Sequence, residues 1–360
     1  MLGLLTGRRR TSLDCRHLLR MSGDKGIIQF AKRSEPDPES GLTVDDNARA
    51  LMVALNLSDR EGRELALRFV SFMNSAQRDD GTWCNWWLPK KGFVSDLDSE
   101  DSIGRAFLAC SLGMKARWPE VARVCRNMLE KSLPVVPTLR YPRSVAYTVI
   151  AGAILAENSQ DYKDWGWRMA KRGVQDLVSL YIGCKGPDWR WFEDEMTYCN
   201  GVLPHALFAY YILKGDKKVI KVAKEALNFL ADQVFSRGFF TPIGNRGWFK
   251  RGGLMPSFDQ QPVEACSMAL CCWEAFYATG NEEYRQMAQM ACDWYLGRNV
   301  HGLSLYDQET GGCHDGLTPE GLNLNQGAEA LLSLLLALQA NNSLQEESPL
   351  LSQISFWRRP

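Results

Sequence analysis

Long hydrophobic runs are missing from this 360-residue sequence, and so is an excess of charge of one sign. No stretch of about 18 consecutive apolar residues occurs, so no transmembrane helix is expected. Lys and Arg number 42, as do Asp and Glu, and a chain of zero formal net charge has no overall attraction for nucleic acid or for an anionic membrane. Nucleic acids and membranes are therefore excluded from the expected partners.

Paired cysteines and clustered histidines are missing as well. The 11 cysteines include no Cys-x-x-Cys pair and the 4 histidines have no metal-ligand spacing, so neither a metal nor another cofactor is expected. Cys271 and Cys272 lie within an apolar helical segment and are expected to be free thiols packed between helices. This cysteine usage predicts a reducing, cytoplasmic location.

The chain does contain a regular alternation of two kinds of helical segment, and its few strand signals fall in loops. The first kind is apolar on nearly every side, and such a helix is buried on every side. The segments of this kind are 48–57, 103–114, 145–156, 202–213, 263–278 and 328–338.

The second kind is amphipathic. Tyr284, Met287, Ala288 and Ala291 recur at the i, i+3, i+4, i+7 spacing of one helical stripe. The same pattern occurs in residues 60–76 and in the segments that follow Pro119, Asp161 and Asp216.

Alternation of buried and half-buried helices, recurring about every 40–60 residues, predicts an all-α fold of the (α/α)6 toroid type, with an inner ring inside an outer ring. We assign the toroid to residues 24–340. Residues 1–23 are expected to be a disordered basic arm that helps to close the ring. Residues 341–360 are polar and interrupted by Pro349, so they are expected to be a tail with at most a short closing helix.

In such a toroid the six outer-to-inner connections must lie at the same end. These connections are long, polar and aromatic, whereas inner-to-outer turns such as 214–216 and 279–281 are short. Helix caps are needed at both ends and do not explain this asymmetry. It predicts a funnel at one end, with inner-helix N-termini pointing into it.

One connection, residues 188–201, carries the acids Glu193, Asp194 and Glu195 directly after Trp189 and two further aromatics. Aromatic rings stack on the apolar faces of sugars, and carboxylates supply acid, base or hydroxyl recognition. The sequence therefore predicts a carbohydrate site here.

Catalysis is assigned to carboxylates from different connections, because adjacent acids cannot face one bond in two roles. We expect Glu193 or Glu195 to work with Asp101 or Asp46. The residues expected to bind substrate are Asp45, Trp83, Trp86, Arg143, Trp189, Asp194, Gln261, Glu264, Asp315, Asn325 and Glu329. Structural interpretations stay open for several of them: Asp45 and Asn325 as helix caps, and Glu264 and Glu329 as first-turn acids.

Several motifs together resemble the six-hairpin glycosidase-like domain of bacteria, which occurs alone or fused to a glycosyltransferase domain. They are the segments 26–31, 43–51, 98–105, 192–198, 311–317 and 325–329. The resemblance implies the (α/α)6 fold and a carbohydrate role. Cys199 and Val202 depart from the pattern, in which a polar residue and an arginine are expected, and this implies altered substrate choice or lost catalysis.

Three functions remain open. The first is an inverting glycoside hydrolase, which needs two carboxyl groups about 6.5–9.5 Å apart. The second is a sugar epimerase or isomerase, which uses histidines, and His205, His301 and His314 are the candidates. The third is a non-catalytic glycan-binding domain that works beside a glycosyltransferase partner.

Overall fold

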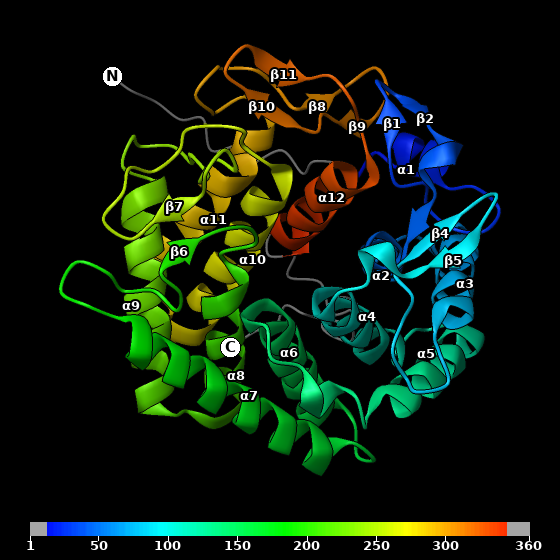
Figure 1. Cartoon of the computed structure of the whole chain (residues 1–360), viewed down its shortest axis with the longest axis horizontal. Coiled ribbons are helices and arrows are strands. Elements are labelled where there is room, and N and C mark those ends of the chain that lie inside the picture. Colours follow the sequence, from blue (N-terminus) through cyan, green and yellow to red (C-terminus); the bar gives the residue numbers. More distant parts are fainter. Residues whose placement is uncertain (1–12, 344–360) are drawn as a thin grey trace, which may run out of the picture.

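The protein folds as a double ring of helices. A computed structural model describes residues 13–343, and its inner helices form a closed circle in which each packs against the next and the last packs against the first (Figure 1). They are α2 (Val44–Ala54), α4 (Glu100–Gly113), α6 (Pro142–Asn158), α8 (Val202–Lys214), α10 (Pro262–Thr279) and α12 (Ala328–Ser343). Each of the six segments predicted to be buried corresponds to one of these helices, although 48–57 and 103–114 run past the ends of α2 and α4.

The outer ring is made by the amphipathic helices, each packed on the inner helix that precedes it. These are α3 (Asp59–Ala76), α5 (Pro119–Ser132), α7 (Lys163–Cys184), α9 (Lys217–Val234) and α11 (Glu282–Tyr295). Since their apolar stripes face inward and their polar faces face solvent, the predicted all-α (α/α)6 toroid is confirmed.

The sixth outer position is occupied by the other end of the chain. Helix α1 (Arg16–Met21) packs against α12, with Leu18 and Met21 completely buried. Residues 13–23 were expected to belong to a disordered arm, but they include this helix, because its apolar side chains pack into the core. Residues 1–12 and 344–360 lie outside the described residues.

Short turns join each inner helix to its outer partner, and two of them share one design. Gly215 and Gly280 end α8 and α10 in the left-handed conformation, with φ of 68° and 67°. Asp216 and Asn281 follow and cap α9 and α11, each accepting hydrogen bonds from the first-turn backbone.

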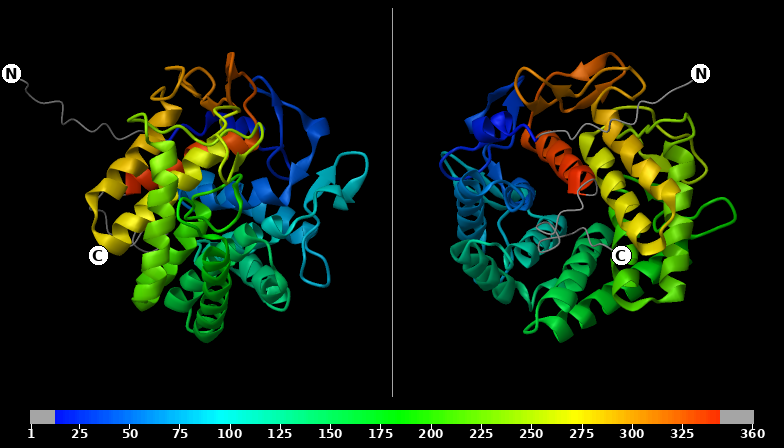
Figure 2. Two further views of the ribbon diagram at one scale, coloured as in Figure 1. Left: turned by 60° about the vertical axis from the view of Figure 1, so that its left-hand side comes forward. Right: turned by 180° about the vertical axis from the view of Figure 1, so that it is seen from behind.

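The long connections lie at the opposite end of the ring, which faces the viewer in Figure 1; Figure 2 (right) shows the end with the short turns. They contain short strands: β1 (Ala31–Lys32), β2 (Glu35–Pro36), β3 (Leu42–Thr43), β4 (Trp86–Leu88), β5 (Gly92–Val94), β6 (Glu195–Met196), β7 (Phe249–Lys250), β8 (Tyr306–Asp307), β9 (Gly312–Cys313), β10 (Gly316–Thr318) and β11 (Gly321–Asn323). Three 3-10 turns accompany them: Pro38–Ser40, Ser95–Leu97 and Val136–Thr138.

Antiparallel pairing ties neighbouring connections together around this end. Strand β3 pairs with β4, and β6 pairs with β7. Gln260 and Leu317 exchange two backbone bonds of 2.9 Å, and the Ala328 N–H donates to the Gln29 carbonyl at 3.0 Å. The connections are therefore held as a rigid rim.

All 11 cysteines are free, and Cys271 and Cys272 are buried as expected. No helix within residues 13–343 is long and apolar enough to cross a membrane.

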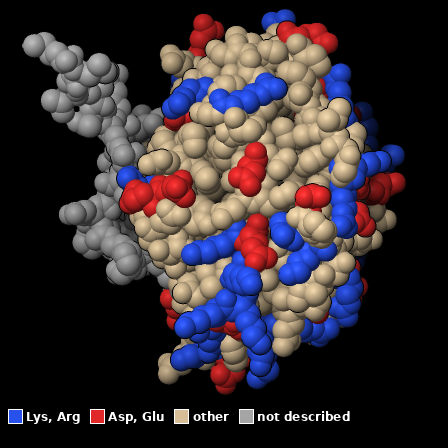
Figure 3. All heavy atoms as spheres, turned by 90° about the vertical axis from the view of Figure 1, so that its left-hand side faces the viewer, with Lys and Arg blue, Asp and Glu red and all other residues tan. Residues whose placement is uncertain are grey.

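Charge is balanced overall but uneven on the surface. Figure 3 shows Lys and Arg side chains gathered on the lower half of the side that α7 and α9 form. Exposed basic residues of these helices are Lys163, Arg168, Lys171, Arg172, Lys217, Lys218, Lys221 and Lys224. The end with the long connections has a different character, because carboxylates gather there.

Candidate functional site

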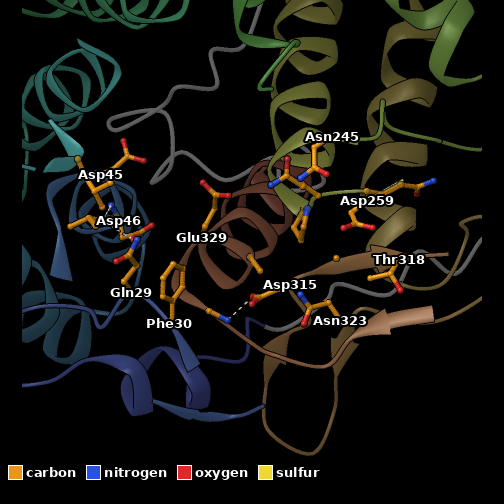
Figure 4. Close-up of a pocket in the computed structure, with 18 of the residues that line it drawn as sticks. Gln29, Phe30, Asp45, Asp46, Asn245, Asp259, Asp315, Thr318, Asn323 and Glu329 are labelled. Carbon is orange, nitrogen blue, oxygen red and sulfur yellow. Dashed lines mark hydrogen bonds between the residues drawn. The ribbon is translucent and has the colours of Figure 1, made fainter. Parts of the chain in front are cut away.

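A cleft of about 480 Å³ lies among the long connections (Figure 4). Its walls come from the N-terminal connection, from the starts of α2 and α12, and from the connections before α4, α10 and α12. No Lys, Arg or His occurs among the described residues that line it. The carboxylates of the lining are Asp45, Asp46, Asp259, Asp315 and Glu329, and the amides are Gln29, Asn85, Asn245, Gln260, Gln261 and Asn323.

Arg49 of α2 holds three of these carboxylates from within the ring. Its Nη1 atom lies 2.9 Å from Asp45 Oδ2 and 3.2 Å from Asp46 Oδ1. Its Nη2 atom lies 2.9 Å from Glu329 Oε2 on α12. The buried guanidinium thereby joins the first inner helix to the last and orients the acidic wall of the cleft.

Asp45 and Asp46 are neighbours with opposite pKa shifts. Burial acts to raise the pKa of Asp45, but the charges of Arg105 and Arg49 outweigh it and hold that pKa below its usual value. Burial raises the pKa of Asp46 to about 6, against the charge of Arg49. Both Asp46 oxygens are occupied, one by Arg49 and the other by the Thr43 hydroxyl at 2.7 Å.

Asp315 and Glu329 are more accessible to a ligand. Asp315 Oδ1 accepts a bond of 2.7 Å from the Gly327 N–H, and its side chain makes no ion pair among the described residues. Burial raises the pKa of Asp315 to about 6, and the charge of Glu329 acts in the same direction. Figure 4 shows both carboxyl groups facing the cleft beside the Phe30 ring.

A second group of predicted residues lies at the same end of the ring but outside the described lining of the cleft. Arg143 Nη1 pairs with Glu193 Oε2 at 2.9 Å, and the Tyr198 hydroxyl donates to Asp101 Oδ2 at 2.6 Å. The Arg143 guanidinium lies 4.6 Å from the centre of the Tyr198 ring and also donates to the Tyr198 carbonyl. Glu193, Asp101 and Arg143 are thus brought together through Tyr198, which sequence reasoning had not singled out as a site residue.

Glu264 lies inside the ring of helices, where protein hydrogen bonds hold its carboxyl group. Its carboxyl accepts from the Cys199 and Asn200 backbone N–H groups and from the Asn200 amide. Burial raises the pKa of Glu264 to about 7, although those hydrogen bonds oppose the shift. Cys199 and Val202 are both buried beside it, so the two departures from the family pattern lie in the interior of the ring.

Two tryptophans expected to stack on sugars do not have exposed faces. Trp83 is 1% exposed and its indole donates to the Met73 carbonyl, while Trp189 is 2% exposed and donates to the Glu193 carbonyl. That expectation is wrong for both, because their rings fill the space between the connections and the helices.

Four other predicted residues also lie outside the described lining. Trp86 is half-buried and donates to the Ser40 carbonyl at 2.9 Å. Asp194 is exposed and lies 3.6 Å from Arg251, and Glu195 forms part of β6. The exposed Asn325 caps the Arg33 N–H at 2.9 Å.

The cleft contains residues that sequence reasoning missed. Phe30 is 56% exposed and is an aromatic ring of the lining. The polar residues missed are Gln29, Asn85, Asn245, Asp259, Gln260, Thr318 and Asn323. The sequence did offer an indication for Asn245 and Asp259, since they are polar residues of a long connection. Phe30 had none beyond the motif that contains it, because its place against α12 depends on how the two ends of the chain meet.

None of the four histidines is among the described residues that line the cleft. His205 is buried in α8, where burial lowers its pKa to about 4. His17 and His301 contact backbone carbonyls, of Gln326 and Thr318, and His314 lies beside Asp315 without lining the cleft. Within residues 13–343 no three His, Cys, Asp or Glu side chains are grouped so as to hold a metal ion.

Solved structures share the whole fold. The chain superposes on a sugar epimerase from a ruminal bacterium with 12% identity and a TM-score of 0.69, covering 92% of this chain and 95% of that one. For a cellobiose 2-epimerase from Spirochaeta thermophila the identity is 12% and the TM-score is 0.69, with 93% of this chain and 96% of that one covered. For a family 76 α-mannanase from Bacteroides thetaiotaomicron the identity is 12% and the TM-score is 0.58, with 91% of this chain and 94% of that one covered.

At such identities the similarity shows the fold alone. The six-hairpin glycosidase-like architecture is thereby supported, and the same architecture serves proteins named as epimerases and as hydrolases. No family model and no curated protein matches the sequence.

Proposed function

We propose that this protein is a glycoside hydrolase that acts on an uncharged glycan in the cleft. The observation that carries the proposal is the lining itself: five carboxylates, six amides and an exposed phenylalanine, without Lys, Arg or His among the described lining residues. Carboxylates and amides bind sugar hydroxyls, and the Phe30 face suits the apolar side of a pyranose. Structural neighbours named as carbohydrate enzymes agree with this class of ligand.

Asp315 is assigned as the general acid and Glu329 as the general base. A pKa raised to about 6 keeps a carboxyl group protonated in mildly acidic solution, and one Asp315 oxygen is free to face the glycosidic oxygen. Glu329 is oriented by Arg49 and is half-exposed, so it can accept a proton from an attacking water. Asp46 has a similar pKa, but both of its oxygens are occupied by protein groups.

Hydrolysis by this pair proceeds by inversion. Asp315 gives its proton to the leaving oxygen as the bond to the anomeric carbon breaks. Glu329 takes a proton from the water that attacks the opposite face, so one water is added across the bond. The carboxyl groups then exchange protons with solvent for the next turnover.

Epimerisation is the second candidate, because the structural neighbours include epimerases. It would need an acid and a base at a sugar carbon, for which histidine is the usual group. The described lining offers none, and His205 is buried and neutral. The carboxylate-rich cleft therefore favours hydrolysis.

A screen of neutral oligosaccharides tests the proposal, with reducing ends assayed and the product anomer assigned by NMR. We expect new reducing ends of inverted configuration and a loss of turnover of about 10²–10⁴-fold in Asp315→Asn and in Glu329→Gln. Asp194→Asn is the matched control, since that side chain is exposed and is not among the described residues of the cleft lining. A product of unchanged chain length would instead support epimerisation, and binding without turnover would support a glycan-binding domain.

The other expectations from sequence remain proposals. They are a cytoplasmic location, a glycosyltransferase partner, and the absence of nucleic acid or membrane among the partners.

A further inference from the structure

We propose a second sugar-binding subsite beside the cleft, formed by the rings of Tyr198 and Trp248, so that the substrate is an oligosaccharide that reaches from the cleft to this platform. The inference rests on the proposed function for its substrate class. It concerns residues that lie outside the described lining of the cleft.

The two rings lie side by side on the rim. Their centres are 6.4 Å apart with planes tilted by 50°; Tyr198 is 40% exposed and Trp248 half-buried. The pairing of β6 with β7 sets this arrangement, because Met196 lies opposite Phe249. Tyr198 follows β6 by two residues and Trp248 directly precedes β7. Two connections far apart in the chain are thus joined to present aromatic surface.

The Tyr198 ring is held on both its edge and its face. Its hydroxyl donates to Asp101 of α4, and Arg143 of α6 lies 4.6 Å from the ring centre. Trp248 has a φ of 49°, which is unfavourable for a bulky residue. Backbone strain such as that at Trp248 is typical of functional sites. An exposed tyrosine contributes little to packing, so the contacts that fix the Tyr198 ring are better explained by ligand binding.

The platform is connected to the cleft on two sides. Asn245 lines the cleft, and three residues of chain to Trp248 span at most about 11 Å. On the other side, Asp45 of the cleft pairs with Arg105, which donates to the Tyr147 hydroxyl at 2.6 Å. The charge of Asp101 acts on that same tyrosine. The connection through Arg105 and Tyr147 is buried, so it fixes the position of the platform relative to the cleft and is not a route for a ligand. A glycan chain that leaves the cleft beside Asn245 is within reach of the platform.

The chemistry of the platform matches that of the cleft. Aromatic faces accept the apolar side of a sugar, and Asp101 and Glu193 are acceptors for its hydroxyls. Glu193 balances the charge of Arg143, whose Nε atom donates to the Tyr198 carbonyl. Its Nη2 atom has no partner but is buried, so the guanidinium presents no exposed cation to an acidic sugar. The ligand class is therefore an uncharged oligosaccharide. A cleft of about 480 Å³ holds only a small part of such a chain.

The test is kcat/KM for a length series of one neutral oligosaccharide, from disaccharide to hexasaccharide. In the unmodified protein kcat/KM should rise with length. Trp248→Asn removes the ring, and Asn tolerates the left-handed backbone. It should lower kcat/KM for long chains by about tenfold through KM and leave the disaccharide value unchanged. Phe93→Ala, which removes an exposed aromatic elsewhere on the rim, should change neither.

An equal loss at every length, or no loss at any length, would overturn the subsite. Should Trp248→Asn not fold, Trp248→Gly gives the same comparison. If no oligosaccharide is hydrolysed, the proposed function fails but the subsite is still tested, by calorimetric titration of the same series. Tighter binding of longer chains that is lost in the Trp248 variant supports it, and length-independent binding contradicts it.

Discussion

At the scale of single residues, buried arginines decide which carboxyl group of the cleft can serve as the proposed acid. Arg49 and Arg105 hold Asp45 as a paired anion, whereas Asp315 lacks a cationic partner among the described residues and is therefore available as an acid. In the sequence alone, these acidic residues cannot be told apart. Only the distance from a guanidinium separates a carboxyl group that can serve as the acid from one that is held as a paired carboxylate.

The pH dependence of turnover follows from Asp315. Because burial raises its pKa to about 6 and a general acid must be protonated, kcat/KM should fall as pH rises through about 6. A pH series of initial rates measures this limb. The residual rate of Asp315→Asn should lack it, and an unchanged limb in that variant would assign the acid to another group.

Arg49 should matter for stability as well as for the site. Arg49→Met leaves Asp45, Asp46 and Glu329 without their shared cation, and breaking a buried ion pair costs about 3–5 kcal/mol. Urea unfolding should show the loss. Arg60→Met, which removes an exposed ion pair, should leave the unfolding midpoint unchanged, and equal midpoints for the two variants would contradict the interpretation.

At the scale of elements, helical periodicity in the sequence was nearly sufficient to predict which helices are inner and which are outer. All-round apolar segments became inner helices, and striped segments such as 282–295 became outer ones, because burial of a helix face depends on local pattern. Close approach of two particular helices depends on small residues facing each other. Between α6 and α7, a Cβ on Gly166 would lie 2.6 Å from the Gly152 carbonyl oxygen.

Two glycines of α7 should therefore respond in opposite directions. Gly166→Ala overpacks the contact with α6 and should destabilise the protein by about 1–3 kcal/mol. Gly183→Ala meets nothing within 4 Å and should stabilise the helix by about 0.5–1 kcal/mol. Chemical denaturation of both variants distinguishes a packing effect from helix propensity, which would raise stability in both.

At the scale of the whole molecule, the two ends of the chain meet to close the ring. Helix α1 occupies the outer position beside α12, and the N-terminal connection supplies Gln29 and Phe30 to the cleft. Composition in this region is basic and suggested an arm, so its order was not expected. Helix α1 is stabilised because a few of its apolar side chains are buried against α12, more than 300 residues away in the chain.

Ring closure can be tested within α1 itself. Leu18→Ala removes a side chain with no exposed surface and should cost about 2–5 kcal/mol. Leu19→Ala in the same helix removes a side chain that is 46% exposed and should cost far less. Thermal unfolding compares them, and a similar loss in the two variants would mean that α1 does not close the ring.

The sequence alone determined the fold class, the alternation of inner and outer helices, the end of the ring that carries the polar connections, and the free buried thiols, because each follows from local pattern or from chain direction. Only the tertiary structure decided which acids share a cleft, that Trp83 and Trp189 are packing residues, and that Phe30 lines the cleft. Those outcomes depend on contacts between connections distant in the chain, where a displacement of a few ångströms changes a buried ring into an exposed one and a paired carboxylate into a free acid.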